Sequence, residues 1–290
     1  MGRKLSIEFV LLLVTLVATG ISCDSIGQKK KYPDTPLYDL SHPHIIDLPE
    51  ALDEISGVAY YPKDTSVFAI IDEDGTLFKI PIMRPKQISS WRFDKSRDYE
   101  DVVLVDSVFY ILESGGDIFT VRFNNNEVVS EKANFSNFSK KSDEFESLYY
   151  DQDIRKLVMV CKDCKEDSKE TVTAFSWAMG DSSEGYQKLW TYNMDKVFKA
   201  LGKDKTNLKF SAASINPFTK EIYAISSIHS VLVILSKNGE VKEVYPLDPG
   251  IYKQPEGITF TPQGDLIISS EFANNGFGQL LIMKNKLKGR

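Results

Sequence analysis

The sequence predicts an all-β protein, a β-propeller of five four-stranded blades. A short motif recurs along the chain at intervals of 46, 46, 65 and 45 residues, beginning at Glu54, Glu100, Glu146, Ser211 and Glu256. Each copy opens a group of short segments that are rich in β-branched and aromatic residues and bounded by Gly, Pro or Asp. A period of this length in a β-rich sequence is typical of a propeller in which each repeat forms one blade.

Three of the repeats show all four strands of a blade. In the first repeat we expect strands at 56–62, 67–72, 76–82 and 88–93. In the second repeat we expect them at 100–106, 108–114, 118–123 and 128–135. In the fourth repeat we expect them at 211–217, 221–227, 231–237 and 240–247.

The fifth repeat contains only three strand segments, at 257–262, 265–271 and 279–284. The segment HIIDLP at 44–49 has the length and pattern of the missing outer strand. We therefore expect an N-terminal strand to complete the last blade, because joining both ends of the chain in one sheet removes exposed edges that invite aggregation.

The third repeat is longer than the others. It contains the charged stretch 165–170 and a helical pattern in which apolar residues fall at Met194, Val197, Phe198 and Leu201, followed by Gly202 as a stop signal. An insertion explains the extra length and leaves five blades. If the insertion instead hides a distorted blade, the count becomes six.

The N-terminus has the features of an export signal. Arg3 and Lys4 precede a short apolar run, and the following Gly20-Ile21-Ser22-Cys23 resembles a bacterial lipoprotein box. We expect residues 1–22 to be a signal peptide, Cys23 to be lipidated, 23–36 to be a flexible tether and 37–290 to be one propeller domain. This predicts a membrane-anchored protein of the bacterial envelope, on the periplasmic face or at the cell surface.

The mature sequence also resembles a known family. The segments LDEISGVAYYP, VFAIIDEDGTLFKI, FESLYYD and QPEGITFTPQGDLIISSE are similar to those of the SdiA-regulated (YjiK-like) family of exported bacterial β-propellers. The fourth repeat departs from the pattern, since FSAASINP has Ser211-Ala212-Ala213 where the others carry an acid. The resemblance implies the architecture rather than an activity.

Carboxylates are expected to gather at one mouth of the propeller channel. The innermost strand of a blade begins on the side where the second strand ends, because the two strands are antiparallel. The strand starts contribute Glu54, Glu100, Glu146 and Glu256, which we predict as metal ligands. The second-strand ends and a following loop contribute predicted ligand contacts at Asp72, Glu73, Glu113, Asp163, Glu271, Asn274 and Asn275.

Three interpretations of this acidic ring are open. The glutamates could accept hydrogen bonds from the backbone of the neighbouring blade, they could bind a hard cation such as Ca²⁺, or the cation could serve in catalysis. For catalysis, His229 is the one histidine predicted on this rim, and it is the candidate for an acid or base.

The cysteines and the net charge narrow the function further. Cys161 and Cys164 are expected to form a small loop disulfide, with free thiols as the alternative. The formal net charge of −6 and the lack of a basic stripe exclude nucleic acid as a partner.

The function classes that remain differ in what occupies the mouth of the channel. We expect a monomeric binding module for a small molecule, glycan or protein, and Ca²⁺ is the one cofactor that we predict. The alternatives are a Ca²⁺-dependent hydrolase of an ester, lactone or phosphoester, and a structural partner in an envelope complex.

Overall fold

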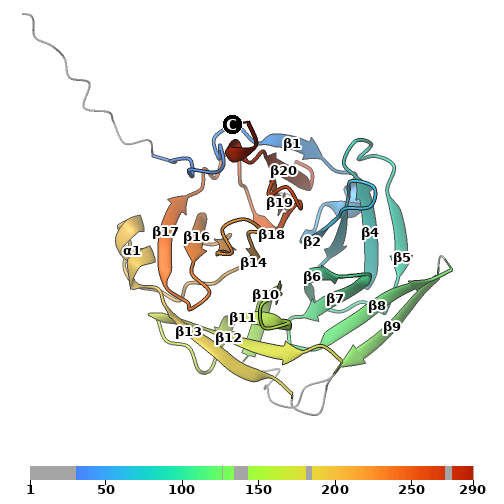
Figure 1. Ribbon diagram of the computed structural model, residues 1–290, viewed down its shortest axis with the longest axis horizontal. Coiled ribbons are helices and arrows are strands. Elements are labelled where there is room, and N and C mark those ends of the chain that lie inside the picture. Colours follow the sequence, from blue (N-terminus) through green and yellow to red (C-terminus); the bar gives the residue numbers. More distant parts are fainter. Residues whose placement is uncertain (1–30, 126, 134–142, 181–184, 272–275, 290) are drawn as a thin grey trace, which may run out of the picture. The chain divides into compact units, whose positions relative to one another are not determined.

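Five four-stranded antiparallel sheets surround a central axis in the computed structural model, which describes residues 31–125, 127–133, 143–180, 185–271 and 276–289 (Figure 1). Blade 1 consists of β2 (Ile55–Tyr61), β3 (Ser66–Ile71), β4 (Thr76–Pro81) and β5 (Ser89–Arg92). Blade 2 consists of β6 (Tyr99–Val105), β7 (Val108–Glu113), β8 (Ile118–Asn124) and β9 (Glu127–Ala133). The predicted propeller of five blades is thus confirmed.

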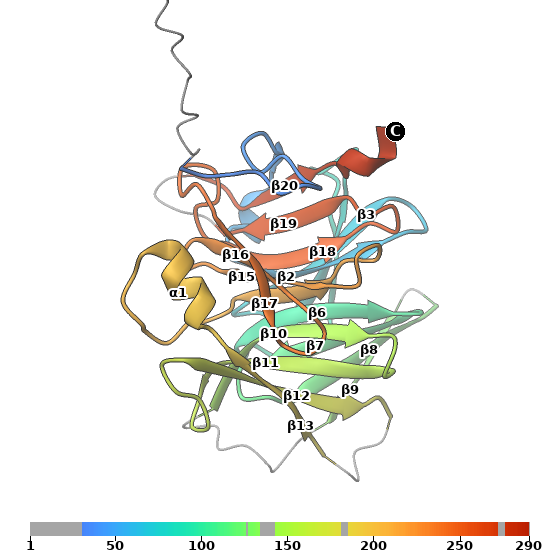
Figure 2. The same cartoon turned by 60° about the vertical axis from the view of Figure 1, so that its left-hand side comes forward.

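Blades 3 and 4 follow the same plan. Blade 3 consists of β10 (Asp143–Asp151), β11 (Lys156–Cys164), β12 (Thr171–Ala178) and β13 (Gln187–Asn193). Blade 4 consists of β14 (Ala212–Ile215), β15 (Ile222–Ser226), β16 (Val231–Leu235) and β17 (Val241–Pro246). The extra length of the third repeat lies in longer strands and in α1 (Asp195–Leu201), which ends at Gly202 with φ 61° and packs beside β17 (Figure 2), so the alternative of six blades is wrong.

Blade 5 closes the ring with strands from both ends of the chain. It consists of β18 (Pro255–Phe260), β19 (Leu266–Ser270), β20 (Gln279–Met283) and the N-terminal β1 (His44–Asp47). β1 runs antiparallel to β20, with His44 opposite Ile282 and Asp47 opposite Gln279. Two short 3-10 helices, η1 (Glu50–Leu52) and η2 (Lys286–Gly289), complete the described elements.

The segment before β1 is also packed against blade 5. The Tyr38 hydroxyl donates to the Gly264 carbonyl over 2.7 Å and accepts from Asn216 over 2.8 Å. Thr35 is already buried, so the packed chain begins slightly before residue 37. Within the described residues, no helix is long and apolar enough to cross a membrane.

The core of the propeller is divided among the five seams between neighbouring blades, each filled by one cluster of buried apolar side chains. Because successive residues of a strand point to opposite faces, each middle strand serves two seams. In β7, Phe109 and Ile111 pack against blade 1, whereas Tyr110 and Leu112 pack against blade 3. This explains why these strands appear in the sequence as nearly continuous apolar runs.

Candidate functional site at the acidic mouth

A β-bulge at the start of the innermost strand places a glutamate at the mouth of the channel. In β6, Tyr99 lies opposite Glu113 and Asp101 lies opposite Leu112, so Glu100 between them has no cross-strand partner. The same irregularity occurs in β10 at Glu146 and in β18 at Glu256. An extra residue in one strand bends the backbone and redirects its side chain, which here turns each glutamate toward the channel.

Serines occupy the equivalent position in the other two blades. Ile55 and Val58 flank the bulge of β2, so Ser56 in blade 1 corresponds to Glu256 in blade 5. Ser211 holds this position in blade 4. Glu54 was predicted at this position of blade 1, but Ser56, two residues further along the chain, occupies it. Glu54 precedes β2 and is exposed.

The second strand of each blade contributes one further residue to the mouth. It lies at the end of the second strand, next to the start of the innermost strand. These residues are Asp72, Ser114, Lys162, Ser227 and Glu271. Asp72 and Glu271 were predicted at this rim, whereas Glu73, Glu113 and Asp163 lie one residue away. A shift of one residue turns a side chain to the other face of a strand.

The three displaced carboxylates are therefore directed elsewhere. Glu113 forms ion pairs with Lys132 at 2.5 Å and with Arg97 at 3.7 Å in blade 2. Asp163 pairs with Lys209 at 2.8 Å, and Glu73 is exposed. None of the three lines the cavity at the mouth, so the ligand contacts predicted for them are not supported by their positions.

The mouth encloses a cavity of about 430 Å³. Its lining contains the five inner-strand residues described above and four of the five second-strand residues, together with residues of three neighbouring loops. The lining residues are Ser56, Asp72, Asp98, Glu100, Glu146, Lys162, Ser211, Ser227, Ile228, Lys253, Gln254, Glu256 and Glu271. Six carboxylates thus face two lysines.

The carboxylates of the mouth are hard to ionise in the protein alone. Burial, followed by the charge of Glu146, raises the pKa of Glu100 to about 9 and that of Glu256 to about 8. Burial and the charge of Asp72 raise the pKa of Glu271 to about 7. These groups hold protons near neutral pH unless a positive charge compensates them.

Blade 3 contains a positive charge that compensates one of these carboxylates. The Lys162 ammonium forms an ion pair with the Glu146 carboxylate. Burial by itself lowers the pKa of Lys162, but its hydrogen bond to Glu146 and the charges of Glu146 and Glu100 raise the pKa above its usual value. Asp72 in blade 1 lacks such a partner, and its buried Oδ1 atom accepts no hydrogen bond.

Residues beside the inner-strand glutamates and serines make hydrogen bonds that join one blade to the next. Asp101, buried next to Glu100, accepts from the Leu148 N–H of blade 3 over 2.8 Å. The Ser269 hydroxyl of blade 5 donates to the Ser56 carbonyl of blade 1 over 2.7 Å. The Glu256 side chain is itself hydrogen-bonded by Ser211 and Ser227 of blade 4, and it still lines the cavity.

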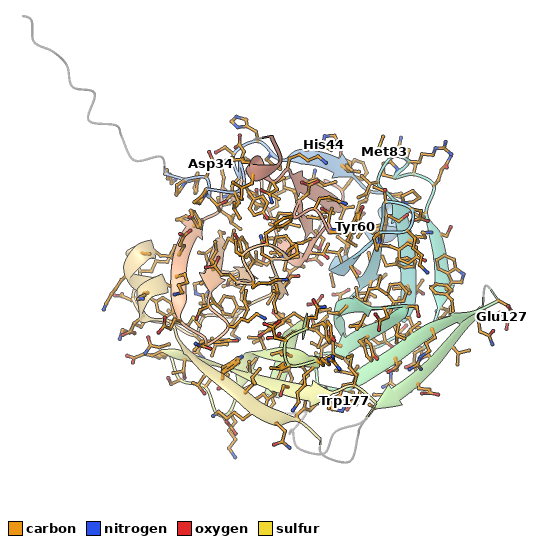
Figure 3. The ribbon with its side chains drawn as sticks, viewed as in Figure 1. Asp34, His44, Tyr60, Met83, Glu127 and Trp177 are labelled. Atoms are coloured by element: carbon orange, nitrogen blue, oxygen red, sulfur yellow. A yellow bond between two sulfur atoms is a disulfide. The ribbon has the colours of Figure 1, made fainter. Side chains whose placement is uncertain are left out.

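Below the acidic ring the channel is lined mostly by apolar and aromatic side chains, and no charged residue lines it among the described residues. The next residues of the five inner strands line a second cavity of about 220 Å³, including Tyr60, Leu104, Tyr150, Ile215 and Phe260. Figure 3 shows Tyr60 near the central axis, whereas Met83 and Glu127 lie at the periphery. The polar chemistry of the channel is therefore concentrated at the mouth where the inner strands begin.

His229 lies outside the cavity lining. Its ring nitrogens contact the Ser226 hydroxyl at 3.1 Å and the Thr206 hydroxyl at 3.0 Å, and the Phe198 ring of α1 lies beside it. Burial and the charge of Lys203 lower its pKa. This histidine is thus not brought together with the acidic ring.

The remaining predicted site residues divide into two groups. Cys161 and Cys164 are joined by a disulfide near Asp167, so neither sulfur is available there as a thiolate ligand. Cys23, Asn274 and Asn275 lie outside the described residues.

Some lining residues are not acids that recur at the repeat positions, and the sequence pattern therefore did not predict them. Ser56, Asp98, Lys162 and Ser227 belong to the mouth but are not predicted as site residues. A usable signal was present: matching Ile55-Ser56-Gly57 with Pro255-Glu256-Gly257 aligns the two glycines and places Ser56 opposite Glu256.

Comparison with known proteins adds information on the fold. No family model matches the sequence, and no related sequence was found among curated proteins. The chain resembles the glutaminyl cyclase of Myxococcus xanthus, at 15% identity and a TM-score of 0.56 over 83% of this chain and 95% of that chain. The likeness is one of fold.

Two other solved enzymes are similar to a comparable degree. A luciferin-regenerating enzyme matches at 10% identity and a TM-score of 0.53, over 84% of this chain and 95% of that one. The PQQ-bound aldose sugar dehydrogenase of Streptomyces coelicolor matches at 8% identity and a TM-score of 0.53, over 84% and 99%. At such identities the shared propeller carries no chemistry from one protein to another.

Proposed function

We propose that this protein is a lipid-anchored β-propeller of a bacterial envelope that acts as a binding module and holds Ca²⁺ at its acidic mouth. Residues 1–22 would be removed on export and Cys23 would carry the lipid. The proposal includes membership of the SdiA-regulated (YjiK-like) family, which rests on the sequence motifs described above.

The observation that carries the proposal is the convergence of three bulge glutamates with Asp72 and Glu271 in one cavity. Groups whose pKa values are raised by burial and mutual repulsion gain most from a cation, because the cation offsets both effects. Ca²⁺ prefers six to eight oxygen ligands in a flexible arrangement. Carboxylate and hydroxyl oxygens around the mouth supply this chemistry.

The unpartnered Oδ1 atom of Asp72 supports the same conclusion. A buried carboxylate oxygen without a hydrogen bond is costly, so such an atom is a suitable ligand for an ion. Ser56 of blade 1 lines the same cavity, and Glu271 of blade 5 is close enough to Asp72 for the charge of Asp72 to raise the pKa of Glu271. We therefore expect the ion on the side of blades 5 and 1.

No observation favours the hydrolase over the binding module. The carboxylates of the mouth could serve a hydrolase as acid or base as well as they could bind a cation, so they do not distinguish the two functions. Among the described residues no histidine lines the mouth, and His229 is engaged by two hydroxyls. The structural-partner alternative has no specific support.

Thermal unfolding of the mature chain, residues 23–290 with Cys23→Ser, tests the proposal. After chelation, restoring Ca²⁺ to about a hundred times its Kd should stabilise the protein by about 3 kcal/mol, or about 5–10 °C in Tm. The effect should disappear in a Glu100→Gln, Glu256→Gln variant and persist in Glu127→Gln, which alters an exposed glutamate of β9. An unchanged Tm of the unmutated protein in millimolar Ca²⁺ would rule out the calcium site.

A further inference from the structure

Lys162 is the one basic residue among the five second-strand positions at the mouth. The others are Asp72, Ser114, Ser227 and Glu271. Its ammonium pairs with Glu146, and both side chains are largely buried, with 27% and 13% of their surface exposed. Blade 3 thus brings its own cation into the ring.

The residues that precede and follow Lys162 in the sequence fix its position. Cys161 is fully buried in the seam between blades 2 and 3, and its disulfide to Cys164 spans only Lys162 and Asp163. Asp163 points the opposite way and pairs with Lys209 at 2.8 Å. The disulfide and this outward ion pair together direct Lys162 to the mouth.

The opposite side of the mouth has no such cation. In the described part of the chain, no lysine or arginine forms an ion pair with Asp72, Glu256 or Glu271. Lys253 lines the same cavity, but it is exposed and forms no ion pair there. The ring is therefore divided into a side at blade 3, where a lysine is paired with a carboxylate, and a side at blades 5 and 1, where the described carboxylates have no paired cation.

We infer that Lys162 is a specificity-determining residue of the mouth. It acts as a tethered cation, positioned by the Cys161–Cys164 disulfide, that occupies Glu146 and confines an incoming cation to Asp72, Glu256 and Glu271. This inference rests on the proposed cation-binding function. It adds that the disulfide is a positioning element for the site and that loss of the tethered charge strengthens cation binding.

Calorimetric titration with CaCl₂ at pH 8 tests the inference in the mature chain carrying Cys23→Ser. Lys162→Met removes the charge and frees Glu146, so Ca²⁺ should bind at least about ten-fold more tightly. Lys242→Met removes the same charge from the outer strand β17, away from the mouth, where it pairs with Glu240 at 3.7 Å, and should change the affinity by less than about three-fold.

A thermodynamic cycle separates positioning from a general structural role. Cys161→Ala, Cys164→Ala should shift Ca²⁺ affinity in the same direction as Lys162→Met in the otherwise unchanged protein. In the Lys162→Met background the same pair of substitutions should have no further effect on affinity, since there is no lysine left to position. If Lys162→Met folds poorly, Lys162→Met, Glu146→Gln removes the unpaired buried charge and should bind Ca²⁺ at Asp72, Glu256 and Glu271 at least as tightly as the unmutated protein.

The outcomes distinguish this inference from the proposed function. Equal or weaker Ca²⁺ binding by Lys162→Met, when the unmutated protein binds Ca²⁺, would overturn the role of Lys162 and leave the calcium site intact. If Lys162→Met binds Ca²⁺ and the unmutated protein does not, the role of Lys162 as a tethered cation would be supported and Ca²⁺ as the native ligand would be contradicted. Absence of binding in both proteins would overturn both.

Discussion

Replacing Glu256 by glutamine should stabilise the metal-free propeller, and the gain should grow with pH. Glu256 has its pKa raised from 4.5 to about 8 in the folded protein, with burial as the main cause. A carboxyl group with a raised folded pKa binds its proton more tightly in the native state than in the unfolded state. Its contribution to stability is therefore complete below pH 4.5 and is lost as the pH rises toward 8.

The magnitude follows from the interval between the two pKa values. At pH 7 the unfolded glutamate is ionised, while the folded one is still mostly protonated. The two states therefore differ in protonation over the interval of about 2.5 pH units between 4.5 and pH 7. At about 1.36 kcal/mol per pH unit, burying Glu256 lowers the free energy of unfolding by up to about 3 kcal/mol at pH 7 and by less than about 1 kcal/mol at pH 5. Glutamine avoids the cost and can still accept hydrogen bonds from Ser211 and Ser227.

Thermal unfolding in chelator at pH 5, 7 and 8 measures the effect. We expect Glu256→Gln to raise Tm by about 5–10 °C at pH 7 and by a few degrees at pH 5. The difference between the two proteins is the relevant quantity, because other groups such as His229, whose pKa is lowered, contribute equally to both. Glu127→Gln, at an exposed site, should change Tm by about 1 °C at every pH. A Glu256→Gln protein no more stable than the unmutated one at pH 7 and 8 would refute the reasoning.

Two further predictions concern the blade seam and the membrane anchor. In Gly257→Ala, the new Cβ would lie 2.3 Å from the Ser269 hydroxyl and 2.5 Å from the Ser56 carbonyl, so urea unfolding should show a loss of about 1–3 kcal/mol. Gly250→Ala, whose Cβ would come no closer than 3.2 Å to a side-chain oxygen, should lose much less. Cys23→Ala should move the protein from the membrane fraction to the soluble fraction and abolish labelling by a fatty acid; membrane retention by the variant would contradict the lipid anchor.

The fold could be predicted from the sequence to an unusual extent because it depends on local, repeated features. The spacing of the repeats and the short apolar segments between turns define blades, and a strand buried on two faces is recognisable as a continuous apolar run. The N-terminal strand and α1 were also predictable, from segment length and from helical periodicity ended by Gly202. Whether the third repeat held one blade or two required the structure, since extra length alone does not distinguish an insertion from a distorted sheet.

The site was predictable only in outline. The glutamates at Glu100, Glu146 and Glu256 were expected at one rim, and they line one cavity. Glu54 was aligned with them because it is acidic, but its blade carries Ser56 at that place. Glu113 and Asp163 were assigned to the same rim, and each turns away to a lysine.

The sequence by itself determined the number of repeats, the order of the strands, the acidic character of one rim and the pairing of both chain ends in one blade. The tertiary structure alone decided which of those acids face the channel, and that Lys162 enters the ring beside them. The physical reason is that a side chain's direction depends on cross-strand register: a bulge adds one residue, and one residue reverses the face. Such a shift leaves hydrophobic periodicity almost unchanged, yet it decides which charges share a cavity.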